Sequence, residues 1–366
     1  MVKKTHVVTF GEIMGRFQPV GHLRLRQVMP GSLDLTFGGA EANVAVSVAR
    51  LGIASRFVTA LPHGPLTDAC LAQLRGFEVD VSGVQVTDRG RFGLYFVERG
   101  ANQRPSTVTY DREGSSISVT PSSDYPWESL LADARWFHVT GITPAISATA
   151  AEATIAALKA ASAAGVPVST DLNFRKKLWR WEPGTAPREL AGRVMREILP
   201  YVDVMIGNEE DAEDVLGIRA GESSVASGRL DVGRYPDVAA QIAEQFPNLR
   251  KIAITLRESI SADSNNWGAM LYDTASRTPT FAPMRDDEYR PFEIRDIVDR
   301  VGGGDAFGAG LIRMLAGDEE VDDSSAVSFA VAASCLAHSL SGDFNLSSFD
   351  EVTALAGGSA SGRVVR

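Results

Sequence analysis

The chain has 366 residues and 44% of them are hydrophobic, which is enough for a large core and excludes a disordered or fibrous class. The 46 acidic and 36 basic residues give a net charge of −10, which argues against nucleic acid or an anionic membrane as a partner. Cys70 and Cys335 lie far apart without metal-ligand spacing, and no apolar run approaches the roughly 20 residues that span a membrane. We therefore expect a cytoplasmic protein in which local arginines would hold any anionic ligand.

The beginning of the sequence predicts one strand followed by a segment without helical period. Residues 5–10 form a short β-branched run, which we interpret as a first strand and not as a signal peptide. Segments 12–36 and 90–112 have no helical period, and the alternation in the second predicts a β-hairpin. We expect both segments to form one small β-lid that excludes water from a transfer reaction. The α/β body then comprises residues 1–11, 37–89 and 113–366.

A glycine pair precedes a buried helix early in the chain. After Gly38 and Gly39, the helix is apolar almost all round, except for Glu41 and Asn43 in its first turn. Glycine backbone and an amide side chain bind hydroxyl groups with little steric obstruction, which favours sugar recognition. In the alternative interpretation, Asn43 only satisfies nearby backbone groups.

The middle of the chain alternates β-branched runs with alanine-rich helical segments, which predicts a parallel sheet with helices on both faces. Strands are predicted over 166–171, 202–206 and 252–256. Ligands of such sheets bind beyond the carboxyl ends of the strands. Four polar residues stand at those ends: Asp171, Asn173, Asn208 and Arg257. Residues 218–236 are rich in glycine and serine and predict a surface loop.

Three consecutive glycines near residue 300 are the most informative feature. Gly302, Gly303 and Gly304 deliver Asp305 to the start of a buried helix. Glycine lets the backbone approach an anion, and the N–H groups and dipole of a helix start favour negative charge beside them. The pattern predicts phosphoryl transfer with Asp305 as general base; the alternative is a turn that only joins a strand to a helix. The chain has no Gly-x-x-x-x-Gly-Lys-Ser/Thr run, so it is not a P-loop enzyme.

Both glycine elements resemble signatures of the ribokinase-like family, also called the phosphofructokinase-B family of carbohydrate kinases. The early Gly-Gly-x-x-x-Asn signature is matched by Gly38 to Asn43. The late Gly-Ala-Gly-Asp signature is matched by Gly302 to Asp305, with Gly303 in place of alanine. The resemblance implies a three-layer αβα sandwich with a central, mainly parallel sheet and a small β-lid. It also implies ATP and Mg²⁺ as cofactors.

Within that family, four runs resemble the 2-keto-3-deoxygluconate kinases: Phe137 to Pro144, Asp171 to Trp179, Leu256 to Ser261 and Gly342 to Asn345. This resemblance implies that Tyr95, Tyr110 and Arg112 contact a sugar acid, and that Arg175 lies between the sugar and the nucleotide phosphates. A carboxylate calls for a cation, although a single arginine is more often simply solvated. The residues expected to bind the nucleotide are Arg175, Asn208, Arg257, Gly302 and Gly304.

The family also carries an Asn-x-x-Glu element that is associated with magnesium, and Asn208 to Asp211 resembles it. Aspartate is one methylene shorter than glutamate, so Asp211 is expected to reach Mg²⁺ through a water, unless Glu210 shares the role. Acidic residues at a helix start also stabilise the helix dipole, which is the alternative.

We therefore expect an ATP-dependent kinase that phosphorylates the C6 hydroxyl of 2-keto-3-deoxygluconate. The alternatives are a related kinase of 2-keto-3-deoxygalactonate, fructose or ribose, and a sugar-acid sensor that transfers nothing. An exposed lid with unpaired strand edges favours a homodimer or a higher homo-oligomer that pairs through the lid.

Overall fold

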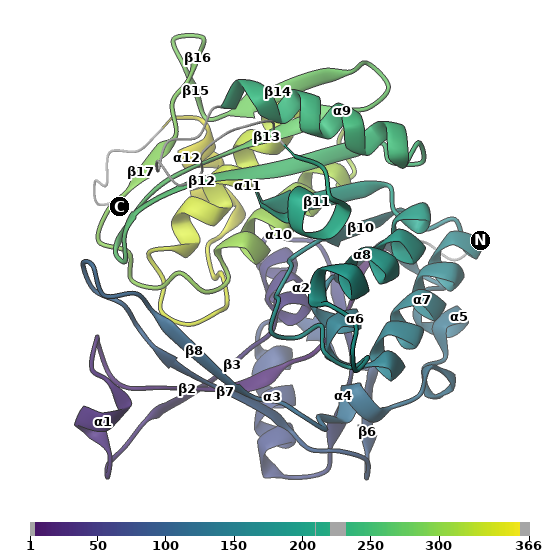
Figure 1. The fold of residues 1–366 in the computed structure, drawn as a ribbon, viewed down its shortest axis with the longest axis vertical. Coiled ribbons are helices and arrows are strands. Elements are labelled where there is room, and N and C mark those ends of the chain that lie inside the picture. The colour runs from purple at the N-terminus through teal and green to yellow at the C-terminus, as the bar shows by residue number, and fades with distance from the viewer. Residues whose placement is uncertain (1–3, 209, 220–231, 359–366) are drawn as a thin grey trace.

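The computed structural model describes residues 4–208, 210–219 and 232–358. Most of the loop expected over 218–236 therefore lies outside the described residues. A large mixed sheet forms the centre, in the order β14-β13-β12-β11-β10-β9-β1-β4-β5, with β6 beside β4 and β17 beside β13. Strands β12 to β5 along this order pair in parallel, and β13 and β14 add an antiparallel edge. This arrangement confirms the expected α/β class (Figure 1).

The strands of the large sheet are β1 (His6–Phe10), β4 (Ser55–Pro62), β5 (Val79–Asp80), β6 (Val84–Thr87), β9 (Ala134–Thr140), β10 (Val168–Asp171), β11 (Val204–Asn208), β12 (Lys251–Ser261), β13 (Ser264–Asp273), β14 (Thr278–Ala282) and β17 (Phe292–Ile294). A further two-stranded ribbon consists of β15 (Met284–Arg285) and β16 (Glu288–Tyr289). The predicted strands at 166–171, 202–206 and 252–256 correspond to β10, β11 and the first half of β12.

The longer helices are α2 (Ala40–Arg50), α3 (Pro65–Gly76), α7 (Ala148–Ala163), α8 (Pro187–Ile198), α9 (Tyr235–Gln245), α10 (Gly303–Leu315), α11 (Asp323–Ala337) and α12 (Phe349–Ala356). The short helices are α1 (Leu25–Val28), α4 (Ser116–Val119), α5 (Trp127–Leu130) and α6 (Ile142–Ile146). Single turns of other helix types are η1 (Ser122–Asp124), η2 (Leu199–Tyr201), η3 (Ala212–Leu216) and η5 (Val232–Arg234).

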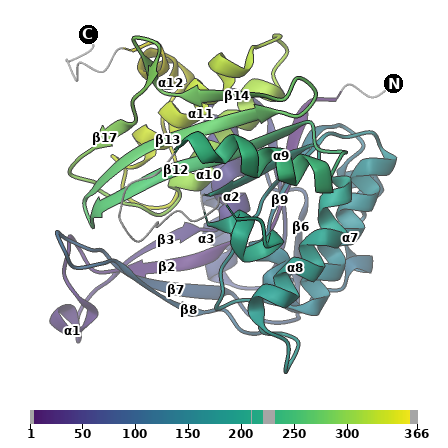
Figure 2. The same cartoon turned by 45° about the horizontal axis from the view of Figure 1, so that its top comes forward.

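Helices cover both faces of the large sheet because its central strands are apolar on both sides. In β1, Val8 packs into the core under α7, α8 and α9, whereas Val7 packs into the core under α2, α10 and α11. Both side chains are completely buried. Figure 2 shows α7, α8 and α9 on one side of the sheet and α2, α10 and α11 on the other. The predicted three-layer αβα sandwich is therefore confirmed.

A separate small sheet is formed by the two segments without helical period. It contains β2 (Met14–Gln18), β3 (Asp34–Gly38), β7 (Gly93–Glu98) and β8 (Thr107–Asp111), in the order β3-β2-β7-β8. Residues of β7 alternate between buried and half-buried, as the sequence pattern predicted. The small sheet projects from the body beside the β12–β13 turn, where the N–H of Ala262 donates to the carbonyl of Asn102 at 2.7 Å (Figures 1 and 2).

No helix among the described residues is long and apolar enough to cross a membrane.

Candidate active site

A cavity of about 380 Å³ lies between the carboxyl edge of the large sheet and the small sheet. It brings together almost all of the site residues that the sequence predicted. Those that line it are Gly39, Asn43, Tyr95, Tyr110, Arg112, Arg175, Asn208, Asp211, Arg257, Gly302, Gly303, Gly304 and Asp305. Gly38 stands just behind this wall, because a Cβ on Gly38 would meet the Asp343 carboxylate at 2.3 Å and the Tyr95 hydroxyl at 2.5 Å.

The glycine loop forms the start of helix α10. Gly302 is the N-cap in a left-handed conformation, with φ of +86°, and a Cβ there would lie 2.2 Å from the carbonyl oxygen of Asp343. The side of Gly304 where a Cβ would stand is open, with nothing within 4 Å. Asp305 belongs to the first helical turn, beside N–H groups that no residue of the preceding turn can pair. The loop therefore presents backbone donors to the cavity without side chains in the way.

Gly303, which replaces the alanine of the family signature, has a tertiary explanation. A Cβ at this position would lie 2.8 Å from the imidazole of His338, which fills the space an alanine methyl would need. His338 is buried and its Nδ1 lies 2.7 Å from the carbonyl of Ser334. Burial lowers the pKa of His338, so the ring is neutral at physiological pH.

Asp305 and Asn43 are in contact because helices α2 and α10 pack against each other. The Asn43 amide donates to Asp305 Oδ2 at 2.6 Å, and its Oδ1 accepts from the N–H of Gly39 at 3.2 Å. Asn43 therefore satisfies local backbone and also faces the cavity, so its two interpretations are compatible. Burial raises the pKa of Asp305 to about 6, and the Asn43 hydrogen bond opposes that rise. A carboxyl with this pKa is largely ionised at neutral pH and can accept a proton.

Arg112 is already paired inside the protein. It forms a buried ion pair with Glu12, and its guanidinium lies 5.4 Å from the centre of the Tyr110 ring. Tyr95 packs against Tyr110 with ring centres 6.1 Å apart. Glu12 is a cavity residue that the sequence reasoning missed, although it follows directly after the first strand, where ligand-binding residues of parallel sheets gather.

Asp211 ties two strand ends together. Its Oδ1 accepts from the N–H of Phe174 at 3.1 Å and its Oδ2 from the N–H of Asn208 at 3.0 Å. Asp171 lies at the adjoining strand end, and burial together with the nearby Asp211 carboxylate raises its pKa well above the usual value. The described residues contain no group of three or more His, Cys, Asp or Glu side chains that could hold a metal ion.

Asp171 and Asn173, which the sequence places at a strand end, also line the cavity. Lining residues to which the sequence assigned no role include Trp267, Arg300, His338 and Asp343. Asp343 lies in the run Gly342 to Asn345, which had a recognisable signal but no assigned role. Trp267 and His338 pack together with ring centres 5.4 Å apart and carried no signal, because antiparallel β13 and the end of α11 meet the site only in three dimensions.

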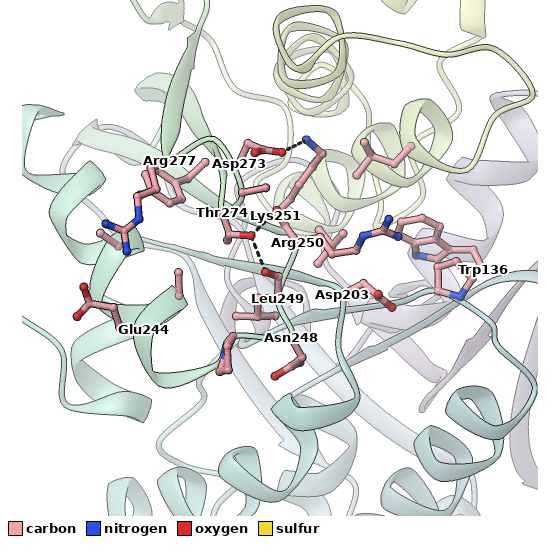
Figure 3. A pocket seen from close by; sticks show the side chains of 18 residues that line it. Trp136, Asp203, Glu244, Asn248, Leu249, Arg250, Lys251, Asp273, Thr274 and Arg277 are labelled. Carbon is pink, nitrogen blue, oxygen red and sulfur yellow. Dashed lines mark hydrogen bonds and ion pairs between the residues drawn. The ribbon is translucent and has the colours of Figure 1, made fainter.

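A second cavity, of about 870 Å³, lies at the amino ends of the parallel strands (Figure 3). Three of its charged side chains are bonded within the protein. Lys251 bonds to Asp273 at 3.0 Å and to Asp323 at 2.5 Å, and Asp203 accepts from the N–H of Val168 at 2.9 Å. The guanidinium groups of Arg250 and Arg277 lie on opposite sides of this cavity in Figure 3. It therefore offers no convergent set of charges, despite its larger volume.

A glycine loop at a helix start, a carboxyl with a pKa near neutrality and an αβα sandwich together define a phosphotransferase for a small hydroxylated molecule. The model of the pfkB family of carbohydrate kinases matches residues 4–232. The chain therefore belongs to the pfkB family and is a carbohydrate kinase, as the sequence resemblance indicated.

Individual relatives are similar over the whole length. The crystal structure of the 2-dehydro-3-deoxygluconokinase of Thermotoga maritima is 43% identical, with a TM-score of 0.86, and covers 98% of this chain and 99% of its own. The 2-dehydro-3-deoxygalactonokinase of Haloferax volcanii is 33% identical over 97% of this chain and 98% of its own length. The ATP-bound fructokinase of Xylella fastidiosa, at 23% identity and a TM-score of 0.73 over 96% of this chain and 98% of its own, shares the fold.

Proposed function

We propose that this carbohydrate kinase transfers the γ-phosphoryl group of ATP to the C6 hydroxyl of 2-keto-3-deoxygluconate, also named 2-dehydro-3-deoxygluconate. One observation carries the proposal: the same cavity holds a carboxyl suited to act as base, Asp305, and the guanidinium of Arg112. Glu12 pairs with this guanidinium, but the buried Nε of Arg112 has no hydrogen-bond partner among the described residues, which leaves a donor for a substrate carboxylate. A neutral sugar would not need that cation. The Thermotoga and Haloferax relatives, both named for deoxy sugar acids, support a sugar acid as substrate.

In the reaction, the C6 oxygen attacks the γ-phosphorus while the bond between that phosphorus and the bridging oxygen of ADP breaks. Asp305 takes the hydroxyl proton, and Asn43 holds the carboxylate in place by the 2.6 Å hydrogen bond. The N–H groups of Gly302 to Asp305 stabilise the negative charge on the transferring group. The products are ADP and 2-keto-3-deoxy-6-phosphogluconate.

The remaining lining residues divide between the two substrates. Arg175, Asn208 and Arg257 are proposed to bind the nucleotide phosphates together with Gly302 and Gly304. On the sugar side, the proposed contacts are Gly38, Gly39, Asn43, Tyr95, Tyr110 and Arg112. Arg175 is proposed to reach both substrates, because it lines the cavity beside Asp171 and is a source of positive charge for Asp305.

Mg²⁺ fits this site only as a companion of the nucleotide. It commonly binds through phosphate oxygens, several waters and one or two carboxylates, so a dedicated protein cage is not required. Asp211 would hold it through a water, since both of its oxygens already accept backbone N–H groups. When bound, the ion would neutralise phosphate charge.

We also propose that the small sheet, with segments 12–36 and 90–112, works as a lid on the body formed by 1–11, 37–89 and 113–366. The support is that Tyr95, Tyr110 and Arg112 line the cavity from the small sheet. Hydrogen exchange of these segments should slow when sugar acid and nucleotide bind together. Segments already as protected as helix α2 without ligand would contradict a closing lid.

Two copies are proposed to pair through the small sheet. The support is a group of apolar side chains at 43–64% exposure, on β3 and on the connection from β2 to β3: Val20, Leu23, Met29 and Leu35. The outer strands of the small sheet, β3 and β8, also have no further strand paired to their outer edges among the described residues. Light scattering should give the mass of a dimer, and Leu35→Lys should reduce that mass.

We also propose a cytoplasmic location for this kinase, because ATP is made there and both cysteines are free thiols.

An assay that couples ADP release to NADH oxidation tests the substrate. The candidates are 2-keto-3-deoxygluconate, 2-keto-3-deoxygalactonate, fructose and ribose at fixed ATP and Mg²⁺. We expect the highest kcat/KM with the gluconate form. A preference for 2-keto-3-deoxygalactonate would assign this C4 epimer as the substrate. A preference for fructose or ribose would overturn the assignment of a sugar acid. No turnover with any of them would favour a sensor.

A further inference from the structure

Arg16 is a completely buried cation on β2 of the small sheet, and it does not line the active-site cavity. Its Nη1 donates to Asp343 Oδ1 at 2.5 Å, and its Nη2 donates to Gln18 at 2.7 Å and to Asp299 Oδ2. Asp299 and Asp343 are themselves buried. One guanidinium from the small sheet therefore joins two carboxylates from two separate loops of the body, which lie more than 40 residues apart in sequence.

Both of those loops shape the phosphoryl-binding turn. Asp299 Oδ1 accepts from the N–H of Val301 at 3.2 Å, and Asp299 Oδ2 accepts from the N–H of Gly342 at 3.4 Å. The backbone of Asp343 packs so closely on Gly302 that a Cβ on Gly302 would lie 2.2 Å from the Asp343 carbonyl. Arg16 therefore holds two carboxylates whose own loops contact Val301 and Gly302. These are the residues immediately before the helix start that carries the general base.

Asp343 continues the chain of contacts to the base itself. Its Oδ2 lies 3.5 Å from the Asn43 amide nitrogen, which donates to Asp305 at 2.6 Å. A planar guanidinium can hold two carboxylates in a fixed relative geometry, which an ammonium group cannot reproduce. Without Arg16, two carboxylates would face each other in a buried site, and the loops that carry them would move apart or take up protons.

We propose that Arg16 is a positioning residue for phosphoryl transfer, which locks the glycine turn only while the small sheet is docked on the body. The inference rests on the proposed kinase reaction but not on the identity of the sugar. A docked lid would then both close the cavity and complete the geometry of the phosphoryl-binding loop. Turnover would depend on a residue that touches neither substrate.

The test compares Arg16→Gln with a matched control, Arg56→Gln. Arg56 also bridges two carboxylates, Asp80 and Asp133, each at 2.7 Å, but it lies at the amino end of β4, away from the cavity. Its loss removes another arginine bridge between two carboxylates, a more exposed one, without touching the glycine turn. Unfolding temperature, KM for ATP and for the sugar, and kcat are measured for parent and variants. The substrate is whichever of the four sugars the parent phosphorylates best.

We expect Arg16→Gln to lower kcat by about 10- to 100-fold, the scale for misplacing a catalytic group by about 1 Å, with both KM values changed by less than about threefold. Arg56→Gln should lower the unfolding temperature but leave kcat within about twofold of the parent, because it lies far from the reacting groups. Arg16→Lys should keep a kcat between those of the parent and Arg16→Gln, since lysine keeps the positive charge but not the planar set of N–H donors that holds two carboxylates.

Asp299→Asn provides a second route if Arg16→Gln does not fold. It keeps the shape of Asp299 and should lower kcat in the same way, and its effect should not add to that of Arg16→Lys, because both disturb one contact. Equal kcat in parent, Arg16→Lys and Asp299→Asn would overturn the proposal. So would a loss in Arg16→Gln that is matched by Arg56→Gln at the same loss of stability. A parent that prefers another sugar would overturn the substrate assignment alone.

Discussion

The two edges of the large sheet carry cavities of opposite character. At the carboxyl edge, about 380 Å³ is surrounded by a glycine turn, carboxyls with raised pKa values and four arginines. At the amino edge, about 870 Å³ is lined by Lys251, which pairs with Asp273 and Asp323, and by Arg250 and Arg277, whose guanidinium groups do not converge. Strand direction is the reason for the difference, because the loops after parallel strands converge on one edge and can be varied without disturbing the sheet.

The comparison shows that volume is a poor guide to function in this fold. The smaller cavity is marked by groups held in unfavourable protonation or backbone states, such as Asp305 with its raised pKa and Asn173 with its left-handed φ of +38°. Such states cost stability and persist where the surrounding structure enforces them. Each of the following experiments asks whether the carboxyl edge alone carries the activity.

The largest effect is expected for Asp305→Asn. Asparagine keeps the shape but cannot accept the proton, so kcat should fall by about 100-fold or more. The pKa of Asp305 is raised on folding, so its ionised form opposes folding at neutral pH, and the variant should unfold at an equal or higher temperature at pH 7.5. Steady-state kinetics and a melting curve measure both. A kcat within about threefold of the parent would remove Asp305 as the base.

Arg112→Ala should have the next largest effect, and it should depend on the substrate. Hydrogen bonds to charged groups contribute about 1.5–3 kcal/mol, so kcat/KM for the sugar acid should fall about 10- to 150-fold. Activity on fructose or ribose, where measurable, should change much less. Glu12 loses its partner in this variant, so the Glu12→Gln/Arg112→Ala double variant serves as the control for an unpaired buried carboxylate. An equal loss on acid and neutral sugars would assign Arg112 to the phosphates or to the small sheet.

The pH dependence should follow the protonation of Asp305. Since burial raises its pKa to about 6, the reactive carboxylate is lost as the pH falls through 6, and kcat/KM should drop about tenfold for each further unit. The Asn43 hydrogen bond favours the ionised form of Asp305. In Asn43→Ala, the fall of kcat/KM at acidic pH should therefore begin at a higher pH. Measurements of kcat/KM across pH 5–9 at saturating ATP give this pH dependence. A profile that stays flat down to pH 5 would contradict a base with this pKa.

The smallest effect is expected at the amino edge. Arg250→Ala and Arg277→Ala remove exposed charges from the larger cavity and should leave kcat and KM within about twofold of the parent. Substrate saturation curves on both variants give the comparison directly. A drop in kcat/KM of tenfold or more in either variant would show that the amino edge contributes to activity and would end the distinction between the two edges.

Much of the body could be predicted from the sequence because its signals are local. The β-branched runs between alanine-rich helices placed β10, β11 and the first half of β12, and the run of three glycines placed Asp305 in the first turn of a buried helix. The paired glycine signatures also placed the chain among the carbohydrate kinases. These features are set by backbone preferences and hydrophobic period, which act over a few residues.

Contacts between distant segments could only be read from the tertiary structure. No local pattern indicated that Glu12 would pair with Arg112, that His338 would fill the place of a methyl on residue 303, or that Arg16 would join Asp299 and Asp343. Each of these depends on how the small sheet docks on the body and on how α2, α10 and α11 pack. Local patterns determined which elements form and where the chemistry gathers, whereas packing between them decided which charges meet, because a buried charge takes its partner from whatever the folded chain places beside it.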